Sequence, residues 1–300
     1  MDEQCQMDEQ QAFKLLEASE NYQVLTRIKP VDAYQSGKPE TARLAMVLDV
    51  ETTGLDTAAD KIIELGFVVC RYDAQSGEVY DVLHRYDGFE DPGEPISDVV
   101  KTLTGIDDAM VQGQKLDDDL INSWLDRADL VIAHNAGFDR KMVERRFPSA
   151  VDCRWACSFK GIDWQAEGIA SAKLDYLAYR FGFFFEGHRA VNDAEATLHL
   201  LSMTLPVSRQ PAMQALLASA RKPVVRLLAS FNYNEQLVPT LKARSYVWFP
   251  DKKLWHKLVP ESERDTESKW LAHALRNAKN SKVTTVPLTA KDIYSIREMM

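Results

Sequence analysis

Residues 44–55 read LAMVLDVETTGL, an apolar run that leads into Asp49, Val50 and Glu51 and then into a Thr-Thr-Gly turn. A near-continuous apolar run of this length is typical of a strand that is buried on both faces of a sheet. Because Asp49 and Glu51 are two residues apart, their side chains leave the same face of the strand. Gly54 allows the chain to turn sharply and lets a ligand approach closely. The stretch predicts a buried strand that presents two carboxylates at its carboxyl end.

The segments that follow alternate as expected of an α/β sheet. Two further strands are predicted at 62–70 and 78–86, joined by a hairpin turn at the Ser-Gly of YDAQSG. Three hairpin-like strands followed by alternating helices and strands predict an α/β fold, an RNase H-like mixed sheet flanked by helices. The later elements expected from the pattern are helices at 97–103 and 116–128, a strand at 130–134, and helices at 138–147, 174–182 and 191–203.

The chain divides into four stretches. Residues 1–41 are expected to form a helical appendage and linker packed on the core, and residues 42–204 form the main domain. The two prolines of LPVSRQPA interrupt the pattern, so residues 205–221 are assigned to a linker and helix. Residues 222–300 show a β-α-β-β-α-β order, which predicts a small basic α+β accessory module of the split-βαβ type, with Pro239 inside its first helix.

Composition indicates a cytoplasmic protein with no membrane partner. No apolar run approaches the ~18 residues needed to span a bilayer. The first ten residues, MDEQCQMDEQ, are acidic and polar, whereas a secretory signal is basic and then apolar. The four cysteines lack the spacing of a zinc site and are expected to be ordinary free thiols: Cys5, Cys70, Cys153 and Cys157.

The formal charge of −9 is unevenly distributed. Residues 42–220 carry 17 Lys and Arg against 29 Asp and Glu, a balance of −12. Residues 221–300 carry 15 against 8, a balance of +7, so the C-terminal stretch is the part suited to a phosphate backbone.

A third carboxylate follows the strand predicted at 130–134. Asn135 comes where the next helix begins, so its side chain can cap that helix. Asp139 then falls in the first helical turn, where the helix dipole favours an anion. Taken alone, Asp139 is more simply explained as a first-turn helix acid.

His188 and Asp193 form the last pair of candidate residues. His188 lies in a glycine-containing loop, EGHRA, and Asp193 is five residues further on, inside the following helix. An imidazole can accept a proton from water near neutral pH. Four carboxylates and a histidine supply the oxygen ligands and the base that a two-metal phosphodiesterase needs.

These motifs closely resemble those of the DEDDh, or DnaQ-like, 3′–5′ exonucleases, the family of the proofreading epsilon subunit of DNA polymerase III. The resemblance covers about residues 44–204. In the sister class a tyrosine four residues before the last Asp replaces the histidine, and that position is Arg189 here. The resemblance implies a general base, His188, and four ligands for two Mg²⁺ or Mn²⁺ ions: Asp49, Glu51, Asp139 and Asp193.

The same resemblance implies contacts with the substrate. Leu55 is expected to be the apolar wedge beside the terminal base, and Thr52 and Thr53 to meet the terminal nucleotide. The LTGI segment matches one that lines the nucleotide pocket, which adds Thr104 and Ile106. A helix-end turn explains Thr104 equally well, and ordinary wall packing also accounts for Ile106.

The basic C-terminal stretch interleaves cations with aromatic rings in LKARSYVWFPDKKLWHKLV. These are the ingredients of single-strand binding, although the rings also suit the core of a small module, which we favour for most of them. A weaker signal, QALLA from Gln214, resembles a sliding-clamp peptide, and a helical apolar stripe explains it as well. The candidate nucleic-acid contacts in this stretch are Arg244, Lys252, Lys253 and Lys257.

The sequence therefore predicts a metal-dependent enzyme that releases 5′-mononucleotides from 3′ ends of DNA, in repair or proofreading-like trimming. An exoribonuclease using the same site is an alternative, although short-RNA exonucleases of this superfamily usually have methionine where Thr52 stands. A nucleic-acid or replisome adaptor with minor activity is a second alternative, against which the intact five-residue set argues. No polymerase motif is visible, so a polymerase partner would act in trans.

Overall fold

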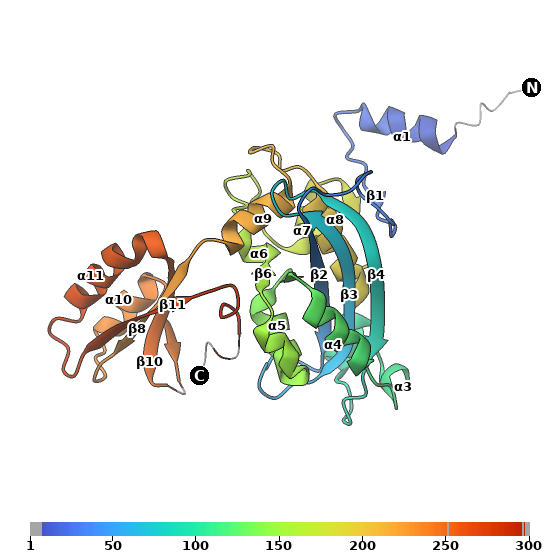
Figure 1. The fold of residues 1–300 in the computed structure, drawn as a ribbon. Coiled ribbons are helices and arrows are strands. Elements are labelled where there is room, and N and C mark those ends of the chain that lie inside the picture. Colours follow the sequence, from blue (N-terminus) through green and yellow to red (C-terminus); the bar gives the residue numbers. More distant parts are fainter. Residues whose placement is uncertain (1–7, 251, 296, 298–300) are drawn as a thin grey trace, which may run out of the picture.

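The computed structural model describes residues 8–250, 252–295 and 297. Its larger part is built on a five-stranded sheet in the order β4-β3-β2-β5-β6, flanked by helices (Figure 1). β2 pairs with β3 and β3 with β4 in antiparallel fashion, while β2–β5 and β5–β6 are parallel. This mixed sheet confirms the predicted fold. Its strands are β2 (Ala42–Thr52), β3 (Ile62–Asp73), β4 (Val79–Phe89), β5 (Leu130–Ala133) and β6 (Trp155–Cys157).

Both faces of the sheet are buried because alternate residues of β2 face opposite layers. Ala45 and Val47 belong to the hydrophobic core shared with α7, α8 and α9. Met46 and Leu48 belong to the second core, shared with α4 and α5. The helices of this part, with one 3-10 turn, are α2 (Asp98–Thr104), α3 (Asp108–Val111), α4 (Asp118–Arg127), α5 (Ala136–Arg146), η1 (Pro148–Asp152), α6 (Ser158–Gly161), α7 (Leu174–Arg180), α8 (Ala190–Ser202) and α9 (Ala212–Ala220).

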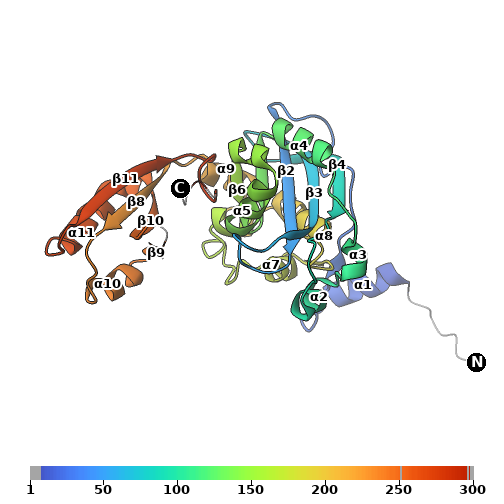
Figure 2. The ribbon, with the colours of Figure 1, turned by 90° about the horizontal axis from the view of Figure 1, so that it is seen from below.

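The N-terminal segment is attached through a short strand. β1 (Thr26–Arg27) pairs in parallel with β7 (Phe183–Phe184). The helix α1 (Glu9–Glu17) has no buried residue and projects from the body of the molecule (Figure 2). The predicted packing of this segment on the core does not extend to the helix, whose apolar side chains Leu15 and Phe13 are exposed, whereas Ile28 and Tyr34 of the same segment do pack against the core.

The C-terminal part is a second, antiparallel sheet in the order β11-β8-β10-β9. The strand and helix order is β-α-β-β-α-β, as predicted. α10 and α11 cover one face, where Val225, Leu227 and Leu271 form part of the core. Pro239 lies in the first turn of α10, where a missing N–H breaks no helical hydrogen bond. The elements are β8 (Val224–Ser230), α10 (Leu237–Ala243), β9 (Val247–Phe249), β10 (Leu254–Pro260), η2 (Glu261–Glu263), α11 (Arg264–Ala274) and β11 (Lys282–Leu288).

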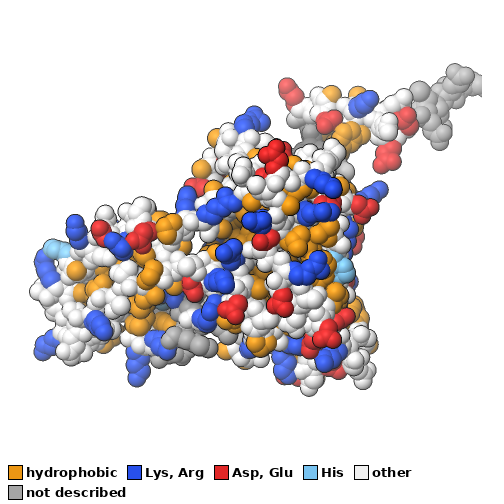
Figure 3. Space-filling view, in the orientation of Figure 1, with side chains coloured by type: hydrophobic (Ala, Val, Ile, Leu, Met, Phe, Trp, Pro, Cys, Tyr) orange, Lys and Arg blue, Asp and Glu red, His pale blue; other side chains and the backbone are white. Residues whose placement is uncertain are grey.

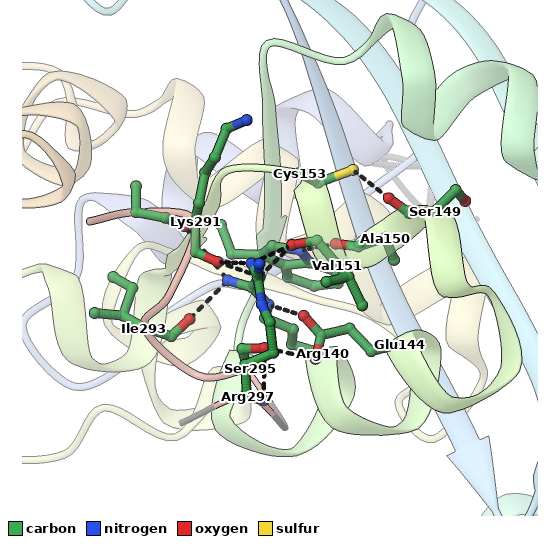
Figure 4. Close-up of polar contacts among 12 residues, drawn as sticks. Arg140, Glu144, Ser149, Ala150, Val151, Cys153, Lys291, Ile293, Ser295 and Arg297 are labelled. Carbon is green, nitrogen blue, oxygen red and sulfur yellow. Dashed lines mark hydrogen bonds and ion pairs between the residues drawn. The ribbon is translucent and has the colours of Figure 1, made fainter. Parts of the chain in front are cut away.

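After β11 the chain returns to the larger part, and we call residues 289–295 with Arg297 the C-terminal strap. The backbone N–H of Trp155 donates to the carbonyl of Ala290 at 2.9 Å, so the strap extends the edge of β6. The guanidinium of Arg140 is wholly buried and donates to the carbonyls of Ile293 (2.8 Å) and Lys291 (2.7 Å) (Figure 4). The strap fixes the C-terminal sheet against α5.

Among residues 8–250, 252–295 and 297, no helix has both the length and the apolar character that crossing a membrane requires. The cysteines among them, Cys70, Cys153 and Cys157, are buried free thiols, as predicted. Cys5 lies outside the described residues.

Candidate functional site

Three of the predicted carboxylates meet at the carboxyl end of β2. Ligand oxygens of Asp49, Glu51 and Asp193 all lie within 4.8 Å of one another. Asp49 and Glu51 come from β2, and Asp193 comes from the first turn of α8, which packs across β2 and β3. The loop before α8 and the end of β2 are distant in sequence, so tertiary packing creates this cluster.

The fourth carboxylate, Asp139, lies beside this cluster in the first turn of α5. Its side chain is only 2% exposed. After burial itself, the negative charge of Asp139 is the largest cause that raises the pKa of Asp49. Asn135 occupies the N-cap position of α5, but the predicted capping contact is wrong because its side chain makes no such hydrogen bond. Its ψ of 58° departs from the extended conformation that directs a cap oxygen towards the helix.

Burial and mutual repulsion raise the pKa values of all four carboxyl groups. Burial is the main cause for each, and it raises the pKa of Glu51 to about 8 and those of Asp139 and Asp193 to about 7. The pKa of Asp49 also lies well above its ordinary value. A buried set of oxygen ligands with excess negative charge fits hard divalent cations such as Mg²⁺ and Mn²⁺, which relieve the repulsion.

The raised pKa values predict how the stability of the metal-free protein depends on pH. The folded state retains protons that the unfolded chain releases near pH 4, so unfolding becomes easier as the pH rises from about 4 to about 8. We expect the free energy of unfolding in EDTA to fall between pH 6.5 and 8.5 by about 1.4 kcal/mol per pH unit for each retained proton.

Thermal melts in EDTA and in Mg²⁺ test this expectation. The range above pH 6.5 avoids His134, whose pKa burial lowers to about 4 and which therefore destabilises the fold only at lower pH. Mg²⁺ is expected to flatten the pH dependence. Equal slopes with and without Mg²⁺ would contradict the assignment of the cluster as a cation site.

His188 lies in the loop before α8, and the backbone of this loop contacts the cluster. His188 is exposed and has a φ of 61°, in the left-handed region that non-glycine residues seldom adopt. The backbone N–H of Arg189 donates to the carboxylate of Asp193 at 3.2 Å, and that of His188 also hydrogen bonds to it. The imidazole is thus carried by a backbone that is tied to one of the candidate ligands.

A salt bridge that the sequence did not reveal holds this loop. Glu64 of β3 is wholly buried and is paired in register with Glu51. It accepts two hydrogen bonds from the guanidinium of Arg189, at 2.9 and 2.7 Å, and one from the backbone N–H of Ala190, at 2.8 Å. Glu64 therefore anchors both the loop and the start of α8. A single acid within the apolar run IIELGFVVC was the available signal.

Gly66 is a second residue that the motifs did not single out. It pairs in register with Asp49, and a Cβ atom there would lie 2.1 Å from the backbone nitrogen of Val191. The glycine lets the first turn of α8 rest directly on β3 and so places Asp193 beside Asp49. A lone glycine in a strand often marks such a close approach of backbones.

The residues expected to meet the terminal nucleotide follow β2. The hydroxyl of Thr52 donates to the carbonyl of Gly54 at 2.6 Å, and the hydroxyl of Thr53 donates to Asp60 at 3.1 Å. Leu55 is 88% exposed, so packing against the described residues does not explain its apolar side chain. It follows β2 by three residues, and its role as a wedge stays a prediction.

Thr104 and Ile106 lie away from the surface. The Thr104 hydroxyl donates to the carbonyl of Val100 at 2.9 Å and accepts from the backbone N–H of Ile106 at 3.1 Å. The Ile106 side chain is wholly buried in a small apolar cluster with Ile63 and Ile96. These contacts agree with the helix-end and wall-packing alternatives.

The four candidate cations of the C-terminal part fall into two pairs. Arg244 and Lys257 both form ion pairs with Glu267, at 3.0 and 3.1 Å, so one carboxylate offsets half of their combined charge. Lys252 and Lys253 are exposed between β9 and β10. Core packing was favoured for most of the rings here, and it is confirmed for three of the four: Tyr246, Phe249 and Trp255 are buried, whereas Trp248 is exposed. In α9, the side chains of Leu216 and Leu217 are likewise buried, as the helical-stripe explanation of QALLA requires.

Comparisons with known proteins agree with this geometry. The family model described as the RNase T exonuclease matches residues 46–201. The chain is 36% identical over 166 residues to the DNA polymerase III PolC-type protein of Halalkalibacterium halodurans, covering 52% of this chain and 11% of that protein. It is 31% identical over 179 residues to the PolC-type protein of Bacillus subtilis, covering 56% and 12%. The chain therefore spans about a tenth of the length of these curated relatives.

Solved structures show a more distant similarity. A structure of exonuclease I aligns with a TM-score of 0.49 and 18% identity, covering 79% of this chain and 70% of that one. A structure of the E. coli exonuclease I in complex with a dA16 oligonucleotide aligns with a TM-score of 0.45 and 17% identity, covering 84% and 64%.

Proposed function

Because this chain belongs to the RNase T exonuclease family, with a DnaQ-like domain, we propose that it hydrolyses DNA from the 3′ end and releases 5′-mononucleotides. The observation that carries the proposal is the convergence of Asp49, Glu51 and Asp193 within 4.8 Å, next to the buried Asp139. Four clustered acids that raise the pKa of one another suit a metal-dependent phosphodiesterase.

Each residue of the cluster has a role in this proposal. Asp49, Glu51, Asp139 and Asp193 would hold two divalent cations. Such cations, when bound, stabilise developing charge on phosphate oxygens and lower the pKa of water. His188, on the exposed loop, takes up the proton of the attacking water. Arg189 and Glu64 position that loop, because their salt bridge is tied to the start of α8.

DNA is the favoured polymer because the curated relatives are named as DNA polymerases. A trimming or proofreading role would require a polymerase partner that acts in trans. We further propose that the protein acts in the cytoplasm. The exoribonuclease alternative uses the same carboxylates and histidine, so only substrate preference separates the two.

Digestion of matched 5′-labelled DNA and RNA oligonucleotides, in Mg²⁺ and in EDTA, tests the proposal. We expect a ladder that shortens from the 3′ end of DNA in Mg²⁺ and is lost in EDTA. A ladder on RNA alone would favour the exoribonuclease alternative, with a role in RNA degradation. No ladder on either polymer would make the adaptor with minor activity the leading explanation.

Replacing the histidine tests the assignment of the base. His188→Ala is expected to lower kcat by about 10²–10⁴-fold, because a positioned base contributes about that much. His273→Ala is the matched control, since His273 is exposed and lies on α11, a helix that covers the C-terminal sheet. Equal activities of the two variants would remove His188 from the reaction.

A further inference from the structure

A groove of about 520 Å³ lies between α5 and β10, where the two parts of the molecule meet. Its walls include Asn135, Phe138 and Lys141 of the α5 region, Lys160 of α6, His256 of β10 and Tyr294 of the strap. We propose that this α5–β10 groove binds the sugar-phosphate backbone of single-stranded DNA upstream of the 3′ end. The inference rests on the proposed function and names where the rest of the substrate strand lies.

The walls of the groove carry positive charge. None of the described residues that line it is Asp or Glu. Lys141 and Lys160 have no ion pair within the described part of the chain, so their charge faces the groove uncompensated. Figure 3 shows Lys and Arg side chains gathered over the junction between the two parts. A strip of uncompensated cations is what a phosphate backbone requires.

His256, Lys257 and Leu258 of β10 all line the groove. Trp255 and Val259 pack under α10 and α11, and Lys257, on the same face of the strand, is paired with Glu267. His256 lies on the opposite face, towards α5. Within the described residues the buried Nδ1 atom of His256 has no hydrogen-bond partner. His256 thus contributes its imidazole to the wall of the groove.

Positive charge reaches this face from both sides. Burial lowers the pKa of His256, and the charges of Arg226 and Lys141 lower it further. Arg226 of β8 and Lys141 of α5 are thus close enough to act on the same imidazole. An anion in the groove would interact favourably with Lys141, which has no ion pair among the described residues.

The groove lies against α5, the helix that also carries Asp139. Asn135 and Phe138 line the groove, and Asp139, the next residue, faces the carboxylate cluster from the same turn of α5. Lys141 is two residues beyond Asp139, about 3 Å along the helix axis but about 200° around it. A strand whose 3′ end lies at the cluster would therefore pass around the first turn of α5, at Asn135 and Phe138, to enter the groove.

Hydrogen bonds of the strap hold one side of the groove in place. Tyr294 lies between Ile293, whose carbonyl accepts from Arg140 at 2.8 Å, and Ser295, whose hydroxyl donates to Glu144 at 2.8 Å (Figure 4). The strap thus holds one wall of the groove against α5. The rings of Phe138 and Tyr294 pack partly against the core and line the groove with their remaining surface, on which an unpaired base can stack.

Binding and turnover of the variant Lys141→Gln/Lys160→Gln test the proposal in the full-length chain. The probes are 5′-fluorescein dT20 and dT4, and binding is followed by anisotropy in EDTA, where no turnover occurs. We expect the affinity for dT20 to fall about five- to tenfold, and the salt slope to fall by about 1.4, since each phosphate contact on a single strand contributes about 0.7. Binding of dT4, which only fills the cluster, is expected to be unchanged.

The matched control is Lys269→Gln/Lys279→Gln, which removes two exposed lysines outside the groove. Thermal melts verify that both variants are folded. The proposal that the groove binds DNA would be overturned if both variants lost the same affinity for dT20. It would also be overturned if Lys141→Gln/Lys160→Gln lost none.

The turnover arm separates this inference from the proposed function. In Mg²⁺ we expect kcat/KM for dT20 to fall in the groove variant while kcat/KM for dT4 is retained. If the wild-type protein cleaved neither DNA nor RNA, the proposed function would fail, and the dT20 binding in EDTA would still decide the groove. Tighter binding of rU20 than of dT20 would overturn the assignment to DNA.

Discussion

Asp49→Asn is expected to reduce hydrolysis of DNA by at least about a thousandfold, which corresponds to about 4 kcal/mol of transition-state stabilisation. Asp49 is the carboxylate on which the repulsion of the other acids converges, since the charges of Asp139, Asp193 and Glu51 all raise its pKa. A neutral amide retains the shape of the side chain and removes the charge that holds a cation. Initial rates on labelled oligonucleotides measure the effect.

The same substitution is expected to stabilise the metal-free protein. Removing one buried negative charge relieves the repulsion among the remaining acids, so Tm in EDTA at pH 8 should rise while the benefit of Mg²⁺ shrinks. Asp119→Asn is the matched control, because Asp119 is an exposed acid in the first turn of α4. Retained activity in pure Asp49→Asn would place Asp49 outside the site. Lost activity accompanied by a lower Tm would indicate misfolding.

Gly66→Ala is expected to give the largest combined loss of stability and activity. The added Cβ would lie 2.1 Å from the nitrogen of Val191 and 2.4 Å from the carbonyl carbon of Ala190. Both neighbours are backbone atoms, so α8 must shift away from β3. Overpacking of this kind costs about 1–3 kcal/mol or more. Because α8 carries Asp193, the shift also separates that carboxylate from Asp49.

Urea unfolding and initial rates, measured together, test this expectation. Gly137→Ala is the control for stability, since its Cβ would meet nothing closer than 4.0 Å and alanine is favoured over glycine inside a helix. We expect Gly137→Ala to be neutral or stabilising. An equally stable and active Gly66→Ala would show that α8 does not need this close contact.

The central strand and the motifs of the site could be predicted from sequence because their signals are local. The run from Leu44 to Leu48 is buried on both faces, and a period of two places Asp49 and Glu51 together. The small C-terminal sheet was also accessible, because each strand and helix there has its own pattern. The three-residue strand β6 (Trp155–Cys157) was missed, since so short a run carries no periodicity.

The supporting contacts of the site were not predictable in this way. Glu64 and Arg189 lie 125 residues apart, and no local pattern pairs them. The compensation of Arg244 and Lys257 by Glu267 likewise depends on which face of β10 each side chain occupies. Composition gives the net charge of the C-terminal stretch but not which cations are paired, and two lysines of the groove, Lys141 and Lys160, belong to α5 and α6.

The buried guanidinium of Arg140 also imposes an order on synthesis. Two of its hydrogen bonds go to carbonyls of residues 291 and 293, which emerge from the ribosome some 150 residues after Arg140 itself. Until then a partly made chain holds a cation in its interior with only Glu144 and the carbonyl of Val151 to meet it. The neighbouring Asp139 lies in the same helix. The surroundings of the helix that carries the candidate ligand Asp139 are therefore complete only once the strap residues have been added.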